Sequence, residues 1–196
     1  SGDAEGDIVA TAAVDIEKTD IFKVLPQFVG DIAQIPPMHS ALKRNGRPLY
    51  ELARKGIEVE REARLVSIRS IEVLGFSDDH LTLRVACSKG TYIRVLAADI
   101  GKALGCGAHL VGLRRTVVGD LNLARSVTLA ELEALDEAGR TACLQPVDAL
   151  LQSLPSVILE GEAANRFCHG NPVDPGTGSA GKTRVYVDGR LIGVGE

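Results

Sequence analysis

The feature that most constrains this chain is a pair of β-rich runs between Ala63 and Ala86, separated by Asp78 and Asp79. In the second run, apolar residues alternate with small or polar ones: Leu81, Leu83 and Val85 against Thr82, Arg84 and Ala86. A period of two is typical of a half-buried strand. The two runs therefore predict an antiparallel hairpin, with one face that other elements must cover.

Helical signals flank this hairpin on both sides. The clearest is Tyr92–Leu104, whose apolar residues Ile93, Leu96, Ala97, Ile100 and Leu104 lie on one helical face. Thr91 is the expected N-cap, and Gly105 ends the helix. Shorter helices are predicted over 20–29 and 48–55, and strands over 8–14 and 109–118. This mixture of elements predicts an α+β fold with a mostly antiparallel sheet.

After Pro155 the pattern changes to shorter elements. A strand at 157–159, a helix at 162–169 and a hairpin around Asp188-Gly189 predict a small β-rich module. Gly176–Gly181 has the letters GxGxxG, but a turn precedes it and a strand follows it. A dinucleotide site needs a strand before these glycines and a helix after them. We therefore expect a loop and no nucleotide cofactor.

Composition excludes some classes of protein. The chain is 45% hydrophobic, and no apolar run approaches the roughly 20 residues of a membrane span. The acidic start has neither the basic nor the apolar region of a signal peptide, and it lacks an initiator Met, so we expect upstream sequence. The four cysteines form no CxxC pair, which indicates free thiols in a reducing cytoplasm and no metal site.

The charge is unevenly distributed along the chain. Net charge is −4, yet residues 40–55 carry a local +4 and residues 84–115 a local +5. Binding to phosphate needs a basic face and not a basic protein. The alternative is that both stretches are simply solvated surfaces, and charge alone does not decide between the two.

The most informative segment is Cys87–Arg94. Gly90 permits a tight turn that brings Lys89, Tyr92 and Arg94 together at the start of the predicted helix. Basic side chains at a helix start suit a phosphate or carboxylate, and a tyrosine ring offers a face on which a base can stack. The alternative is a Thr-capped helix with a half-buried Tyr and an exposed Arg. On the residues alone, both hypotheses stay open.

Longer motifs extend this segment in both directions. Downstream lie Asp99-Ile100-Gly101, Gly105-Cys106-Gly107-Ala108-His109-Leu110 and Leu113-Arg114-Arg115, and upstream lie Ile35-Pro36-Pro37-Met38-His39-Ser40-Ala41-Leu42-Lys43 and Leu49-Tyr50-Glu51-Leu52-Ala53-Arg54-Lys55-Gly56. Together these motifs resemble the TruB-type tRNA pseudouridine synthases. The resemblance implies that residues 1–150 are the C-terminal part of the catalytic domain. It also implies that residues 154–196 are a PUA-like RNA-binding module, incomplete at its C-terminus.

The resemblance also implies an activity and assigns roles to residues. The parent enzyme would isomerise uridine 55 in the T loop of tRNA, without cofactor or metal, as a cytoplasmic and monomeric protein. Arg94 would pair with the nucleophilic aspartate, and Tyr92 and Leu113 would contact the flipped uridine. Lys89 and Gly90 would form the supporting turn. His39 receives no catalytic role and is expected to be a packing or hydrogen-bonded residue.

The family's nucleophilic aspartate lies in a Gly-x-Leu-Asp-Pro-type motif, and this chain has no such motif. Asp174-Pro175 is its one Asp-Pro pair and lies in the predicted tail loop. Gly2–Gly6 matches an acidic connection that we expect to be mobile. We therefore expect the fragment to be inactive, with Arg94 turned to solvent or to a substitute anion, and with exposed apolar surface that favours self-association. The alternative function is a non-catalytic RNA-binding module.

Overall fold

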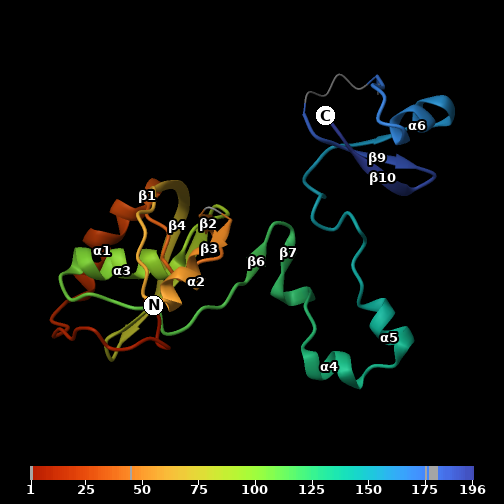
Figure 1. The fold of residues 1–196 in the computed structure, drawn as a ribbon. Helices are drawn as coiled ribbons and strands as arrows, with labels where there is room; N and C mark the ends of the chain where they lie inside the picture. The colour runs from red at the N-terminus through yellow and green to blue at the C-terminus, as the bar shows by residue number, and fades with distance from the viewer. Residues whose placement is uncertain (1, 45, 175, 177–180) are drawn as a thin grey trace. The chain divides into compact units, whose positions relative to one another are not determined.

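The computed structural model describes residues 2–44, 46–174, 176 and 181–196 (Figure 1). It divides into two compact units, Ser1–Leu113 and Arg114–Glu196. Each unit has its own core, and each is described by itself below. Within the described residues, no helix is long and apolar enough to cross a membrane.

The first unit is built on a three-stranded antiparallel sheet. Its order is β1-β4-β5, with β1 at Gly30–Gln34, β4 at Arg64–Ser77 and β5 at His80–Cys87. Asp78 and Asp79, at φ 49° and 63°, make the two-residue turn between β4 and β5. This left-handed pair is what a tight hairpin between twisted strands requires. The predicted hairpin and the antiparallel sheet are confirmed.

Helices pack against one face of this sheet and enclose the core. The helical elements are α1 (Lys18–Val24), the 3-10 helix η1 (Leu25–Phe28) and α3 (Ile93–Leu104). The core consists of the buried side chains Ile21, Leu25, Ile68, Leu96 and Ile100. Burying each such side chain away from water stabilises the folded state by about 1.5–3 kcal/mol. The amphipathic pattern at 92–104 is thereby explained, because Leu96 and Ile100 are its most buried residues.

Three sequence predictions about residues 8–118 need correction. The helix expected over 20–29 changes to a 3-10 helix at Leu25, because Pro26 lacks the N–H that an α-helix would use. The strand expected over 8–14 does not form: these residues are in no ladder, and Ile8 and Val9 are 85% and 95% exposed. The strand expected over 109–118 is reduced to β6, Val117–Val118, and an isolated bridge at Leu110.

A short hairpin and helix lie between β1 and β4. Strands β2 (Lys43–Arg44) and β3 (Arg47–Pro48) pair antiparallel, and α2 follows at Leu49–Arg54. Pro48 is the N-cap of α2 rather than its first residue. Arg61 donates to the Pro36 carbonyl at 3.2 Å, and Arg44 donates to that of Glu60. These bonds hold the irregular segment before β4 against the rest of the unit.

The second unit combines short helices with a small sheet. Its elements are β6, β7 (Leu121–Asn122), η2 (Leu123–Arg125), α4 (Leu129–Ala134), α5 (Glu137–Ala142), β8 (Ser156–Ile158), α6 (Gly161–Cys168), β9 (Thr183–Val187) and β10 (Arg190–Gly195). In the sheet β10-β9-β8, the pair β8–β9 is parallel and β9–β10 antiparallel. Its core is Leu159, Ala164 and Val185. The predicted α+β class, with a small β-rich C-terminal region, is confirmed.

Candidate RNA-modifying site at the start of helix α3

The turn between β5 and α3 is held by hydrogen bonds to its own residues and to β4. Ser88 donates its N–H to the Ser67 carbonyl at 2.8 Å, and Ser67 donates its N–H to the Ser88 hydroxyl at 3.0 Å. Gly90 has φ +85°, a conformation that a side chain would strain. Thr91 donates its hydroxyl to the Ser88 carbonyl at 3.0 Å. Thr91 therefore closes the turn and is not the helix cap that we predicted.

Tyr92 occupies the N-cap position instead, in an extended conformation and with no side-chain cap. Its backbone N–H donates to Gln34 Oε1 at 3.0 Å, and its carbonyl accepts from Gln34 Nε2 at 3.4 Å. Gln34 is the last residue of β1 and is only 2% exposed. Sequence analysis missed it. Its one signal was a polar residue at a strand position directly before the Ile35-Pro36-Pro37 segment.

Arg94 lies in the first turn of α3 and has two acceptors. Its Nη1 is 2.7 Å from Asp3 Oδ2, and its Nη2 donates to the His39 carbonyl at 3.1 Å. The side chains of Arg94 and Asp3 are 28% and 25% exposed, so the ion pair is partly shielded from water. The anion expected beside Arg94 is thus Asp3, while His39 contributes its backbone. The His39 residue is exposed, which contradicts a packing role. The alternative, a hydrogen-bonded side chain, stays a prediction.

The segment around Asp3 is anchored, contrary to the expected mobile connection. Ala4 donates its N–H to the Leu110 carbonyl at 3.0 Å, and Leu110 donates its N–H to the Gly2 carbonyl at 3.1 Å. These two bonds form a short parallel bridge between Asp3 and Leu110. The bridge places Asp3 next to Arg94, a residue 91 positions later. No local pattern in the sequence indicates this pairing.

Two further predicted site residues, Lys89 and Leu113, are exposed. Lys89 is exposed on the turn beside Gly90. Leu113 is 61% exposed and lies in an irregular stretch at the end of the first unit. In the described part of the chain, no hydrogen bond, ion pair or ring contact joins Leu113 to Tyr92 or Arg94. The structure therefore groups Tyr92 and Arg94 with Gln34 and Asp3. The roles expected for Tyr92, Arg94, Lys89, Gly90 and Leu113 all stay predictions.

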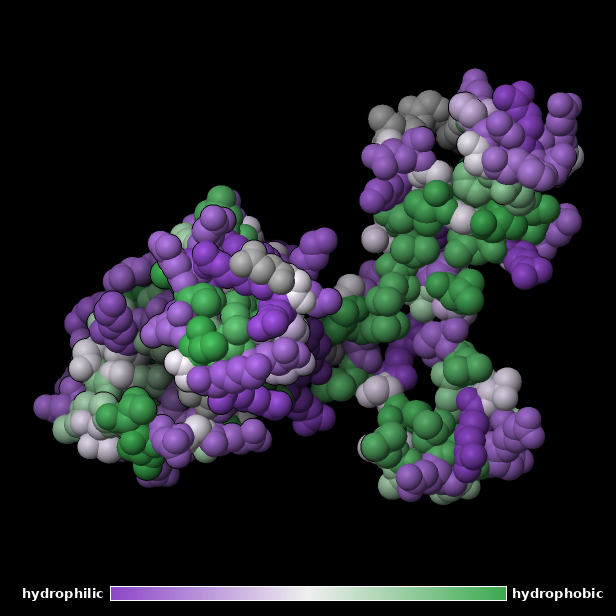
Figure 2. All heavy atoms as spheres, viewed as in Figure 1, coloured by the Kyte–Doolittle hydropathy of each residue, from purple (hydrophilic) through white to green (hydrophobic). Residues whose placement is uncertain are grey.

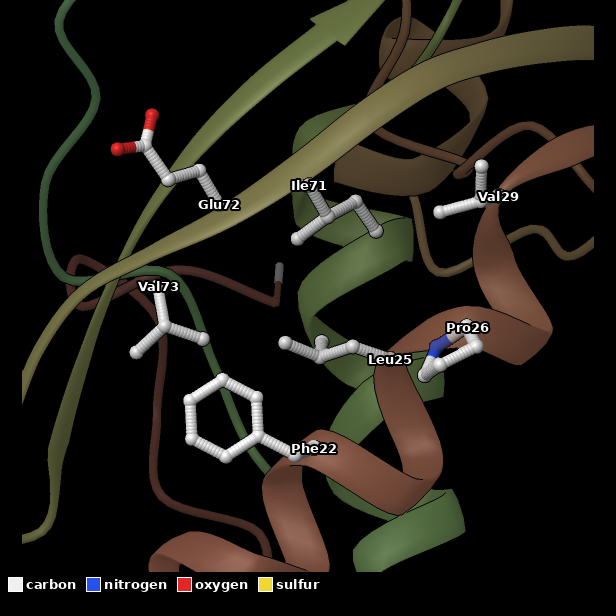
Figure 3. A pocket seen from close by; sticks show the side chains of 7 residues that line it. All are labelled: Phe22, Leu25, Pro26, Val29, Ile71, Glu72 and Val73. Carbon is white, nitrogen blue, oxygen red and sulfur yellow. The ribbon is translucent and has the colours of Figure 1, made fainter.

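One surface groove of the first unit lies away from this site. A groove of about 650 Å³ between the α1–η1 segment and β4 is lined by Phe22, Leu25, Pro26, Val29, Ile71, Glu72 and Val73. Figure 3 shows Ile71 and Val73 turned toward the helical residues and the Glu72 side chain turned away from them. The groove is mostly apolar and contains none of the predicted site residues. The glycine-rich loop at Gly176–Gly181 falls largely outside the described residues. Within those residues, no group of His, Cys, Asp and Glu side chains is arranged to hold a metal ion.

Comparison with known proteins covers nearly the whole chain. Residues 1–93 match the TruB family pseudouridylate synthase N-terminal domain, and residues 94–152 match the tRNA pseudouridylate synthase B C-terminal domain. Residues 155–196 match a further C-terminal domain of pseudouridine synthase II TruB. A tRNA pseudouridine synthase B from Burkholderia mallei is 50% identical over 99% of the chain, which covers 67% of that relative. The chain belongs to the TruB family of pseudouridine synthases.

Other TruB relatives are still more similar or equally so. The tRNA pseudouridine synthase B of Dechloromonas aromatica is 74% identical, and that of Azoarcus sp. is 50% identical, each over the full chain. The chain spans 66% and 65% of the length of these two relatives, slightly less than two thirds. The predicted resemblance is confirmed. The site at Tyr92 and Arg94 straddles the junction at residues 93 and 94 between two of the family's domain models.

Solved structures support the TruB fold. A Cbf5–Nop10–Gar1 complex matches 95% of the chain and 57% of its own matched chain, with TM-score 0.70 and 27% identity. An H/ACA RNP bound to a substrate RNA containing 2'-deoxyuridine matches 95% of the chain and 56% of its own, with TM-score 0.67 and 25% identity. The same arrangement of elements is therefore present in proteins that share about a quarter of the residues.

Proposed function

We propose that this chain is part of a tRNA pseudouridine synthase that converts uridine 55 of the T loop into pseudouridine. The observation that carries the proposal is the arrangement at the start of α3. A guanidinium there is bonded to a carboxylate, two residues after a tyrosine at the helix N-cap. Relatives named for this activity are 50–74% identical over essentially the entire chain. We further propose the cytoplasm as its location and a monomer as the full-length form.

The reaction needs few groups, because it is an isomerisation. The glycosidic bond to N1 of uracil breaks, a bond from the same sugar carbon to C5 forms, C5 loses its proton and N1 gains one. The reaction adds no group and changes no net oxidation state, and we infer that it proceeds without a cofactor. The uridine must first leave the RNA stack, at a cost of a few kcal/mol, and then be held by a flat or apolar wall. Tyr92 and Leu113 are suited to that contact.

Arg94 is suited to support the nucleophile. An opposite charge within about 4–6 Å favours the ionised form of a carboxylate, and only that form can attack. The two acceptors already on Arg94, Asp3 and the His39 carbonyl, fix the plane of its guanidinium. A second carboxylate, from a part of the protein outside these 196 residues, would meet a cation that is already oriented. We infer that this carboxylate is the family's nucleophilic aspartate.

The surroundings of the site are suited to tRNA. Lys89 is exposed beside the Gly90 turn, and Lys43, Arg44 and Arg47 are exposed on the β2–β3 hairpin. The logarithm of RNA affinity falls linearly with the logarithm of salt concentration. Each cation that contacts a phosphate steepens that slope by about one unit. The family models change between residues 152 and 155. We infer from this change that residues 1–150 belong to the catalytic domain, and that residues 154–196 form a separate RNA-binding module.

The proposal is tested by replacing Arg94 in the full-length protein. Arg94→Met should lower turnover of unmodified tRNA by orders of magnitude, because the nucleophile loses its cation, while the Kd for tRNA rises only a few-fold. Arg84→Met is the matched control, since Arg84 is already paired with Glu72 at 2.6 Å on the hairpin. The control should turn over normally. Near-normal turnover in Arg94→Met would refute the role of Arg94. The non-catalytic RNA-binding alternative predicts no turnover by either protein, with the effect of Arg94→Met confined to tRNA binding.

A further inference from the structure

The carboxamide of Gln34 makes an unusual contact, because both of its ends bond to the backbone of a single residue. Oε1 accepts from the Tyr92 N–H at 3.0 Å, and Nε2 donates to the Tyr92 carbonyl at 3.4 Å. Gln34 and Tyr92 are 58 residues apart in the sequence. With this pair of bonds the side chain imitates a neighbouring strand, since strands exchange an N–H and a C=O in the same way.

The burial of Gln34 shows that these bonds determine its position. It is 2% exposed and stands among the most buried large side chains of the described chain. Burying an amide without hydrogen-bond partners costs several kcal/mol of stability. An aliphatic side chain at the same place would carry no such cost. The backbone of Gln34 is already paired in the ladder with Arg64 of β4, so its side chain is free to reach α3. Packing alone would favour Leu or Met here.

Tyr92 is the residue that benefits from such a clamp. It lies between the Gly90 turn and α3, with φ −95° and ψ 104°, and no side chain caps the helix at this point. Its N–H precedes the helix, so no helical carbonyl pairs with it. Its carbonyl also accepts from the Leu96 N–H at 3.0 Å, the first bond of the helix. The Gln34 amide therefore fixes both sides of the residue from which the Tyr92 ring projects.

We propose that Gln34 is a positioning residue of the site: it fixes the Tyr92 backbone, and through it the directions of the Tyr92 ring and of Arg94 two residues later. This inference rests on the proposed function. It predicts that the length and the chemistry of the side chain both matter. Met matches the length without the hydrogen bonds. Glu keeps one acceptor, but when ionised it sets a second oxygen against the Tyr92 carbonyl.

The first experiment measures the clamp in the 196-residue chain itself. In Gln34→Met, NMR hydrogen exchange at the Tyr92 amide should accelerate on the order of tenfold beyond any change in β4 amides, as expected for the loss of one hydrogen bond. In Gln34→Glu, Tyr92 should be protected at pH 5 and lose that protection by pH 8, because only the protonated carboxyl can both donate and accept. Gln27→Met, in the exposed part of η1, is the matched control. Equal exchange in all variants, or no pH effect in Gln34→Glu, would overturn the clamp.

The second experiment measures its effect in the full-length protein. Gln34→Met should reduce kcat at least tenfold while KM for tRNA changes less than about threefold, as for a contact that matters only in the transition state. A loosened Tyr92 amide with unchanged kcat would overturn the positioning role while leaving the proposed function intact. If the unaltered full-length protein formed no pseudouridine in tRNA, the proposed function would be refuted, and this inference with it. The Gln34→Glu exchange measurement does not depend on that outcome, and it still applies if Gln34→Met fails to fold.

Discussion

Each side chain of the site depends on partners that lie far away in the sequence. Arg94 bonds to Asp3 and to the His39 carbonyl, and Tyr92 is held by Gln34. The candidate residues Tyr92 and Arg94 were predictable because they lie together on one turn. Their partners were not, because charge and polarity alone do not say which carboxylate or amide a distant cation or peptide will meet.

The Asp3–Arg94 pair should couple more strongly than an exposed pair of similar geometry. A double-mutant cycle with Asp3→Asn and Arg94→Met, followed by urea unfolding of the 196-residue chain, should give a coupling of about 1–3 kcal/mol. The control cycle, Glu72→Gln with Arg84→Met, removes a pair whose side chains are 57% and 63% exposed. It should give at most about 1 kcal/mol, because water screens it. Equal couplings would mean that the partial burial of Asp3 contributes nothing.

At the scale of elements, the turns and caps follow their local sequence closely. Asp188 and Gly189 have φ 48° and 75° and join β9 to β10, as predicted. Thr128 and Glu131 form a capping box at the start of α4, with the Glu131 N–H donating to the Thr128 hydroxyl at 3.2 Å. These features involve residues at most four apart, so the sequence specifies them without help from the rest of the fold.

Gly101 shows where packing between elements overrides helix preference. It lies in α3, and a Cβ there would stand 2.2 Å from the Ala108 nitrogen and 2.3 Å from the Gly107 carbonyl carbon. Ala normally stabilises a helix by about 1 kcal/mol relative to Gly. We nevertheless expect Gly101→Ala to destabilise the first unit by about 1–3 kcal/mol, because backbone must move to make room. Urea unfolding would measure this, with Gly112→Ala, which meets open space, as the control. Stabilisation of both variants would contradict the close approach.

A polar cluster joins the turn before β8 to β9 and should make the second unit sensitive to acid. Asp148 accepts from the Tyr186 hydroxyl, from Gln152 Nε2 at 3.0 Å and from Arg184 Nη1 at 3.4 Å. The hydrogen bond from Tyr186 is the main cause that lowers the pKa of Asp148 below its ordinary value of 3.8. Its contribution to stability is therefore complete above that value and is lost as the pH falls through the lowered pKa.

We therefore expect Asp148→Asn to flatten the acid dependence of unfolding. The urea midpoint of the second unit, followed by NMR signals of β9, should fall less between pH 6 and pH 3 in this variant than in the unaltered chain. Asp188→Asn, in the exposed turn of the same sheet, is the control. The same hydrogen bond raises the pKa of Tyr186 above 10.0, so its contribution is present below pH 10 and lost at higher pH. Parallel acid curves for all three proteins would refute the role of the cluster.

For the molecule as a whole, the main feature is the amount of apolar surface in contact with solvent. Figure 2 shows apolar side chains gathered over the part of the second unit that carries α4 and α5. Leu129, Leu144 and Val147 are 78%, 75% and 86% exposed. Half of the exposed large apolar residues that the structure describes lie between residues 111 and 150, in short helices, strand β6 and irregular stretches. Self-association of the isolated chain stays a prediction.

The isolated 196-residue chain should form no pseudouridine. Breaking the glycosidic bond requires a carboxylate in reach of the sugar or base, and no aspartate of this chain lies in the family's nucleophile motif. Excess chain would be incubated with unmodified tRNA, followed by chemical labelling of pseudouridine, with the full-length protein as the positive control. The mass of the preparation must correspond to residues 1–196 alone. Product above background would mean that one of these aspartates, with Asp3 the first to test, acts as the nucleophile.

The sequence by itself determined the β4–β5 hairpin, the amphipathic face of α3 and the tight turn at Gly90, because periodicity and backbone sterics act over a few neighbouring residues. Its motifs also indicated the family. Only the tertiary structure decided that Asp3 is the anion beside Arg94 and that Gln34 holds Tyr92, since these contacts join residues 91 and 58 positions apart. Such pairs form only when the strand register and helix packing bring both partners together, and no local pattern encodes that distance.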